Sequence, residues 1–152
     1  MMKVLMENSF ETVVYENRAR VGRLLTKAQS ELVTALDHAL ADFDVSAAQY
    51  VILSTLWYGR ADTAAQICKE ISYSPGAMTR MLDRLEQKNL IVRLPMEDSR
   101  RAYKLELTVE GKAVFPDLLA TSASVMNRFF GSISHQELQQ LETLLQRMTG
   151  TA

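Results

Sequence analysis

The chain has 152 residues with 47% hydrophobic and 23% charged side chains, and its formal net charge is −1. This composition fits one globular domain over residues 1–152 and excludes a disordered chain. The absence of a long apolar stretch excludes a membrane span and a secretory signal, and the single cysteine excludes an internal disulfide, so we expect a cytoplasmic protein.

Two helices are expected in the first part of the chain. Apolar residues three or four positions apart predict a long amphipathic helix over residues 17–43. Asp44 or Ser46 can cap a second helix over residues 47–58, which Gly59 ends.

The centre of the chain predicts two short helices joined by a tight turn. A third helix is expected over residues 62–71, a turn at residues 72–73 and a fourth helix within residues 74–89. Ser74 is a good N-cap because its hydroxyl can accept a backbone hydrogen bond, and the proline after it suits the first helical position. Asn89 tolerates the left-handed conformation that ends a helix. Such a helix-turn-helix can offer one helix to the major groove of DNA.

A β-hairpin and two further helices complete the expected elements. Alternating apolar residues over 90–95 and 103–107 predict two strands, and the polar residues 96–101 form the tip between them. Thr108 can cap a long helix, and Ser134 precedes the last one.

Positive charge is concentrated in the central elements. Residues 74–104 hold 7 basic and 4 acidic side chains, whereas residues 1–73 hold 7 basic and 9 acidic, and residues 105–152 hold 3 and 5. A local basic patch can bind DNA even on a protein whose net charge is near zero, with modest and salt-sensitive non-specific affinity.

The sequence over residues 62–112 carries a specific pattern. It reads AQICKEISYSPGAMTRMLDRLEQKNLIVR and then MEDSRRAYKLELTVEGK, with a D-x-R hairpin tip followed by LTxxGK. These residues resemble the MarR family of winged-helix transcription regulators. Ser72 and Asn89 depart from the family pattern, since each stands where glycine is often found.

The resemblance implies a fold and an assembly. The fold class would be mainly α with a small β-hairpin wing: a winged helix-turn-helix core over about 45–112, with dimerisation helices over about 10–43 and 109–150. A homodimer would bind a palindromic operator in double-stranded DNA and act as a repressor released by a small molecule. The apolar residues near both ends agree with a dimer, although they could instead complete a monomer core; they are Val13, Val14, Tyr15, Phe129, Phe130 and Leu145.

The candidate DNA-binding residues lie on the fourth helix and the hairpin. Arginine can bond guanine through two hydrogen bonds, threonine can donate or accept, and alanine can touch a thymine methyl. By the resemblance, Asp98 would brace an arginine and Arg100 would enter the minor groove. Alternatively, Arg80 and Arg84 are solvated or paired with an acid such as Asp83, and the hairpin tip is an ordinary polar turn. The candidates are Ser74, Gly76, Ala77, Thr79, Arg80, Arg84, Asp98, Arg100, Arg101 and Lys104.

A candidate effector pocket contains aromatic side chains and their neighbours. Family members often bind small aromatic effectors between the dimerisation helices and the winged domain, and aromatic side chains with polar tips suit such a pocket. The same spacing also fits plain helix packing, so ordinary core is the alternative. The candidates are His38, Tyr50, Trp57, Tyr58 and Met78.

Other functions have weaker support in the sequence. Cys68 could make a redox-responsive regulator, but a cysteine inside a helix usually acts as a small hydrophobe. Its spacing from the two histidines matches no zinc pattern, so no metal or cofactor is expected. The chain lacks the common nucleotide-binding and hydrolase motifs, so we expect no enzyme, although a pocket at Trp57 and Tyr58 could be catalytic. A winged-helix module that binds protein is the other alternative.

Overall fold

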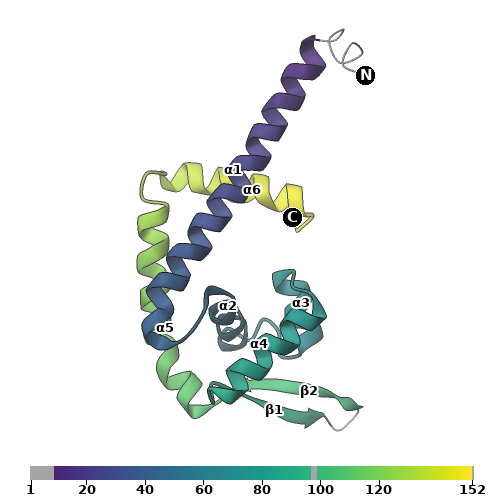
Figure 1. Cartoon of the computed structure of the whole chain (residues 1–152), viewed down its shortest axis with the longest axis vertical. Helices are drawn as coiled ribbons and strands as arrows, with labels where there is room; N and C mark the ends of the chain where they lie inside the picture. Colours follow the sequence, from purple (N-terminus) through teal and green to yellow (C-terminus); the bar gives the residue numbers. More distant parts are fainter. Residues whose placement is uncertain (1–8, 97–98, 152) are drawn as a thin grey trace. The chain divides into compact units, whose positions relative to one another are not determined.

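The structure, a computed structural model, describes residues 9–96 and 99–151 (Figure 1). Its contacts form two units, Met1–Ala35 and Leu36–Ala152. No helix within the described ranges is long and apolar enough to cross a membrane. The elements are α1 (Ser9–Leu40), the 3₁₀ turn η2 (Ala41–Phe43), α2 (Ala47–Trp57), α3 (Ala64–Ile71), α4 (Pro75–Gln87), β1 (Ile91–Met96), β2 (Ser99–Leu107), α5 (Val109–Phe129) and α6 (His135–Thr149). The predicted class, mainly α with one β-hairpin, is confirmed.

The predicted starts of α2, α4, α5 and α6 are confirmed by their caps, and α3 begins at Ala64 rather than at residue 62. Ser46 accepts the Gln49 N–H at 3.2 Å, and Ser74 accepts the Ala77 N–H at 3.3 Å. Thr63, Thr108 and Ser134 cap α3, α5 and α6 in the same way. Each hydroxyl satisfies an amide that has no partner inside the helix, so these local sequence signals fix where the helices begin.

The first helix is longer than predicted. It begins at Ser9 rather than residue 17, because the residues before 17 contain no proline or glycine to interrupt it. It passes into η2 and ends at Asp44, whose left-handed backbone (φ 54°, ψ 37°) turns the chain toward α2.

Two left-handed residues shape the helix-turn-helix. Ser72 (φ 55°) ends α3, and Asn89 (φ 54°) follows the end of α4. Both stand where the family pattern often has glycine. The backbone at both positions nevertheless adopts the left-handed conformation that glycine favours. Asparagine adopts it at low cost, whereas serine is less suited to it.

Substitutions at Ser72 should rank by their tolerance of this conformation. We expect Ser72→Gly to change the free energy of unfolding by about 0 to +1 kcal/mol, because relief of strain exceeds or balances the extra freedom of glycine in the unfolded chain. Ser72→Val should lower it by about 1–2 kcal/mol, since a β-branched side chain is strained at positive φ. Urea unfolding measures the stability of both variants. Equal stability of the valine variant and the wild type would contradict the left-handed backbone of Ser72.

The hairpin is antiparallel and longer than predicted. Ile91 pairs with Leu107 and Pro95 with Tyr103, and after a register shift Met96 pairs with Ser99. The second strand therefore begins at residue 99 rather than 103, so part of the predicted polar tip is strand. Alternation of apolar residues cannot reveal this segment because its side chains are polar. We call residues 91–107 the wing.

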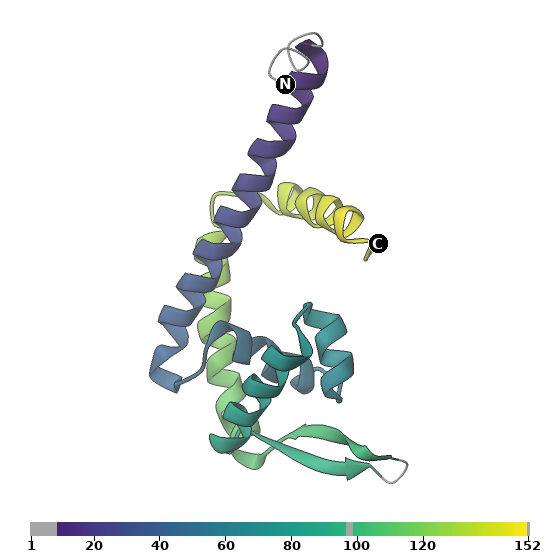
Figure 2. The ribbon, with the colours of Figure 1, turned by 45° about the vertical axis from the view of Figure 1, so that its right-hand side comes forward.

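One core holds the helix-turn-helix, the base of the wing and α5 together. Phe115 of α5 has no exposed surface, and it stacks on Trp57 with ring centroids 4.6 Å apart and on Tyr50 at 6.1 Å. Figures 1 and 2 both show α2, α3 and α4 grouped together, with the wing extending alongside α4. The core thus fixes the end of α2, the wing and the start of α5 relative to one another.

Candidate nucleic-acid interface

The helix α4 has one buried and one exposed face. Met78, Leu82 and Leu85 are buried on one stripe, with at most 2% of each side chain exposed. Residues on the other face are exposed, and among them Gly76, Arg80 and Arg84 follow one another at intervals of four, which places them on one line along the helix. The structure thus places Gly76, Arg80 and Arg84 on one solvent-facing line, with Thr79 also exposed, whereas Ala77 is half-buried.

The N-terminal turn of α4 is open to an approaching molecule. Ser74, Pro75 and Gly76 are exposed, and no atom lies within 4 Å of the position that a Cβ would take at Gly76. The Ala77 N–H donates to Ser74, while Thr79 donates to the carbonyl of Pro75 at 3.0 Å. The exposed first turn carries the positive end of the helix dipole, which favours a phosphate.

Arg93 of β1 binds the two acidic side chains of α4. Its guanidinium lies 2.7 Å from Asp83 Oδ1 and 2.5 Å from Glu86 Oε2, with 22% of the side chain exposed. Partial burial lowers the pKa of Arg93, but the hydrogen bonds to both carboxylates outweigh it, and the pKa is raised. Sequence reasoning missed this residue, because nothing local links position 93 to 83.

These ion pairs bear on one alternative left open by the sequence, the pairing of Arg80 or Arg84 with Asp83. Asp83 is bound to Arg93, and neither Arg80 nor Arg84 forms an ion pair within the described part of the chain. Arg80, Arg84 and Arg93 together carry one more charge than Asp83 and Glu86, so the exposed face of α4 keeps a net positive charge.

Loss of the Arg93 charge should loosen the wing. We expect Arg93→Met, which keeps an apolar stem, to lower the free energy of unfolding by about 0.5–1 kcal/mol at low salt, and by less at high salt. Combination with Asp83→Asn should be less than additive, because the two groups contact each other. Urea unfolding at two salt concentrations measures this, with Glu31→Gln of the exposed Lys27–Glu31 pair as control. If the two substitutions lowered the free energy of unfolding additively, the contact between Arg93 and Asp83 would be contradicted.

The wing residues are described to different extents. Asp98 lies outside the described residues, and only the backbone of Arg100 and Arg101 is described, within β2. Lys104 is exposed and its ammonium lies 2.8 Å from Glu106, whose hydrogen bond raises the pKa of Lys104. Lys104 is therefore the one predicted wing residue with a described partner, and that partner is an acid.

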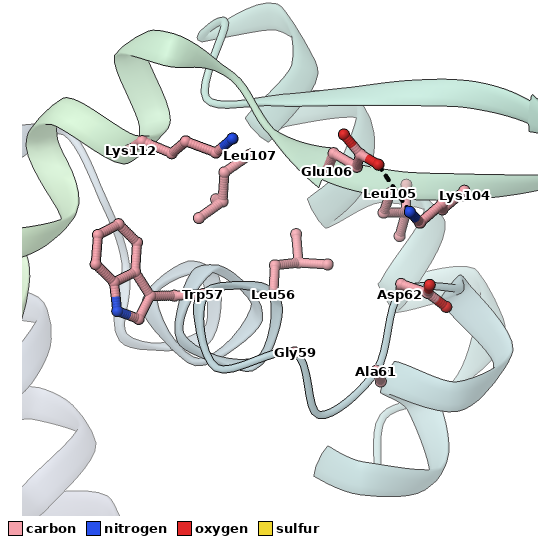
Figure 3. Close-up of a pocket in the computed structure, with 10 residues that line it drawn as sticks. All are labelled: Leu56, Trp57, Gly59, Ala61, Asp62, Lys104, Leu105, Glu106, Leu107 and Lys112. Carbon is pink, nitrogen blue, oxygen red and sulfur yellow. Dashed lines mark hydrogen bonds and ion pairs between the residues drawn. The ribbon is translucent and has the colours of Figure 1, made fainter.

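The five candidate effector residues do not share one surface. Met78 has no exposed surface and Tyr50 has 8%, so both belong to the core, as the alternative interpretation held. His38 is exposed on α1, and Tyr58 is exposed with Arg60 over its ring. Trp57 is 41% exposed and borders a cleft that the other four do not line (Figure 3). Helical spacing alone could not show that Tyr50 and Met78 are buried while Trp57 and Tyr58 are exposed.

Cys68 and the other metal-ligating residue types form no site among the described residues. Cys68 is a free thiol and is half-buried in α3. Among the described residues, no group of three or more histidine, cysteine, aspartate or glutamate side chains could hold a metal ion.

The helix-turn-helix, its exposed basic face and the adjoining hairpin together define a winged-helix DNA-binding protein. The sequence profile described as MarR family matches residues 45–103. The repressor MdtR of Bacillus subtilis is 30% identical over 85% of this chain and 81% of its own length. The multiple antibiotic resistance protein MarR of Escherichia coli K12 is also 30% identical, over 78% and 76%.

A solved structure shares the arrangement. The crystal structure of a mutant E. coli MarR complexed with operator DNA has a TM-score of 0.79 and 27% identity, over 88% of this chain and 96% of that one. The chain described here belongs to the MarR family of transcription regulators. The resemblance found in the central motif is thus confirmed over most of the chain.

Proposed function

We propose that this protein is a homodimeric repressor that binds a palindromic operator and is released by a small-molecule effector. The observation that carries the proposal is the exposed face of α4, where Arg80 and Arg84 are free of the acids that Arg93 binds. A relative bound to operator DNA shares the fold, which supports the same mode of binding here. We place the protein in the cytoplasm, where bacterial DNA is accessible to it.

Within the proposed interface, α4 enters the major groove. Arg80 and Arg84 bond base edges or phosphates, and Thr79 and Ala77 contribute shorter contacts. Arg100 and Arg101 of the wing reach the neighbouring minor groove, where a narrow A·T-rich segment attracts arginine, and Asp98 orients one of them. Lys104 is a weaker phosphate contact, since it must exchange Glu106 for DNA.

The last helix supports a dimer. No residue of α6 is buried, although one side of it is apolar. Leu138, Leu141 and Leu145 are half-buried, and Leu144 and Met148 are exposed by 52% and 63%. A symmetric dimer would cover this face and would set two α4 helices one turn of DNA apart.

The protein acts by binding rather than by catalysis. Its relatives are named as a transcriptional repressor and a resistance regulator, and no catalytic group is needed to hold or release DNA. A small molecule weakens DNA binding if it binds better to a dimer whose α4 helices no longer match the groove spacing.

Selection from a random double-stranded DNA library tests the proposal. At about 150 mM salt, which suppresses weak non-specific binding, we expect enrichment of an inverted repeat with half-site centres about 10 base pairs apart. The protein must be shown to be folded and dimeric in the same buffer. Enrichment of no sequence by a folded dimer would contradict the proposal and favour a winged-helix module that binds protein.

A further inference from the structure

The C-terminal end of α4 carries a lysine whose polar contacts lie within the protein. Lys88 is the C-cap of α4, and its side chain reaches the turn between η2 and α2. Its ammonium donates to the carbonyl oxygen of Asp44 and to Gln49 Oε1 at 3.2 Å, and it lies 3.3 Å from Asp44 Oδ2. These partners are 44 and 39 residues away in the sequence, and all three residues belong to the unit Leu36–Ala152.

The ammonium of Lys88 is fully used by these contacts. A lysine has three N–H donors, and three oxygen acceptors surround this one. Only 27% of the Lys88 side chain is exposed, and Gln49 is buried. Gln49 Oε1 also accepts the Ser46 N–H at 3.1 Å, so this acceptor is fixed by the cap of α2. Lys88 therefore holds the end of α4 at a defined point on the turn that follows α1.

The same end of α4 is also attached to the start of α5. The Thr108 N–H donates to the Leu90 carbonyl at 3.2 Å, and the Thr108 hydroxyl donates to the Asn89 carbonyl at 2.6 Å. Figures 1 and 2 both show the end of α4 beside the start of α5. The residues that follow α4 thus contact one segment that adjoins α1 and another that begins α5, and Lys88 supplies the polar side-chain contact to the first.

A helix held at one end is sensitive to its angle at that end. The 13 residues of α4 span about 20 Å at roughly 1.5 Å per residue. A rotation of about 5° about the C-terminal end would therefore move the first turn by about 2 Å, which is enough to break a hydrogen bond to a base. The first turn is the exposed one, and Arg80 follows it on the same face.

We propose that Lys88 is a positioning residue for DNA binding, which fixes the angle of α4 and hence the separation of the two α4 helices in the dimer. The part that concerns the dimer rests on the proposed function. Loss of the three contacts frees α4 to adopt several angles, so the operator with matched half-sites loses affinity while operators with altered spacing lose little. Lys88 acts without touching DNA, because its donors are used within the protein.

Operator affinity as a function of half-site spacing tests the proposal. The wild type should prefer the selected operator over operators with one base pair added or removed between the half-sites. Lys88→Met keeps the apolar stem and should weaken binding to the selected operator by about tenfold, with altered spacings changed by less than about twofold. Lys88→Arg should behave similarly, because a planar guanidinium does not fit acceptors placed around an ammonium. Lys69→Met, a matched change on the exposed face of α3, should keep the wild-type preference.

A direct phosphate contact by Lys88 gives a different result. It would produce an equal loss at every spacing, a salt slope smaller by about one and recovery in Lys88→Arg, and this result overturns the positioning role. A Lys88→Met variant with wild-type affinities overturns it as well. If Lys88→Met does not fold, Asp44→Asn takes its place, since asparagine keeps the left-handed backbone and removes the charged acceptor. This milder variant should reduce the spacing preference by about twofold to threefold, and an unchanged preference overturns the proposal.

Hydrogen exchange of the unbound protein separates this proposal from the proposed function. In Lys88→Met, the amides of Asn89 and Leu90, whose hydrogen bonds close the end of α4, should exchange about tenfold faster. The amide of Leu118, in the buried part of α5, should exchange at the wild-type rate. Wild-type exchange at Asn89 and Leu90 overturns the attachment whether or not DNA binds. Failure of the wild type to bind any DNA contradicts the proposed function but leaves this measurement valid.

Discussion

Replacement of Arg80 by alanine is expected to weaken specific DNA binding by about 1–3 kcal/mol and to relax the preference at one base pair per half-site. Arg80 is exposed on the same line of α4 as Gly76 and Arg84, and it forms no ion pair in the described part of the chain. It can therefore turn its guanidinium toward a base without first breaking a contact within the protein. Removal of an unpaired exposed arginine should leave the stability nearly unchanged.

The measurement is operator affinity as a function of salt concentration, for the wild type and the variant. Arg128→Ala provides the matched control, because it removes the same charge from the exposed end of α5, outside the helix-turn-helix. We expect the control to keep wild-type affinity. An equal loss in both variants would mean that net charge, rather than a base contact by Arg80, determines the affinity.

Replacement of Gly111 by alanine is expected to lower the free energy of unfolding by about 1–3 kcal/mol. A Cβ at this position would lie 2.1 Å from the carbonyl oxygen of Leu90, which is backbone and cannot turn away. The neighbouring contacts are equally tight, since Thr108 donates to the Asn89 carbonyl at 2.6 Å and accepts the Gly111 N–H at 2.9 Å. An added methyl group must therefore separate α5 from the first residues of the wing.

A second glycine in the first turn of a helix gives the control. The space around Gly76 in α4 is empty to 4 Å, so Gly76→Ala should be neutral or stabilise the fold by up to about 1 kcal/mol through helix propensity. Chemical denaturation compares the two variants, which have the same amino-acid composition because each replaces one glycine by alanine. If Gly111→Ala were as stable as Gly76→Ala, the close approach of α5 to Leu90 would be contradicted.

The sequence by itself determined the capped starts of α2 and α4, the helix-turn-helix and the basic face of α4. These features depend on interactions within a few residues: Ser74 caps the helix that follows it, and Asn89 adopts the backbone conformation that ends that helix. The intervals between Gly76, Arg80 and Arg84 place them on one line of any α-helix, whatever surrounds it. Local chemistry and periodicity are therefore enough to predict the exposed line of residues on α4.

Only the tertiary structure decided which side chains meet across the chain. Arg93 binds Asp83 and Glu86, Gly111 approaches Leu90, and Trp57 faces the base of β2, although each contact joins different elements. Such contacts depend on how elements pack, and no spacing rule in one sequence specifies that packing. The same reason explains why Tyr50 and Met78, predicted in an effector pocket, are buried, and why the cleft beside Trp57 became visible only in the folded chain.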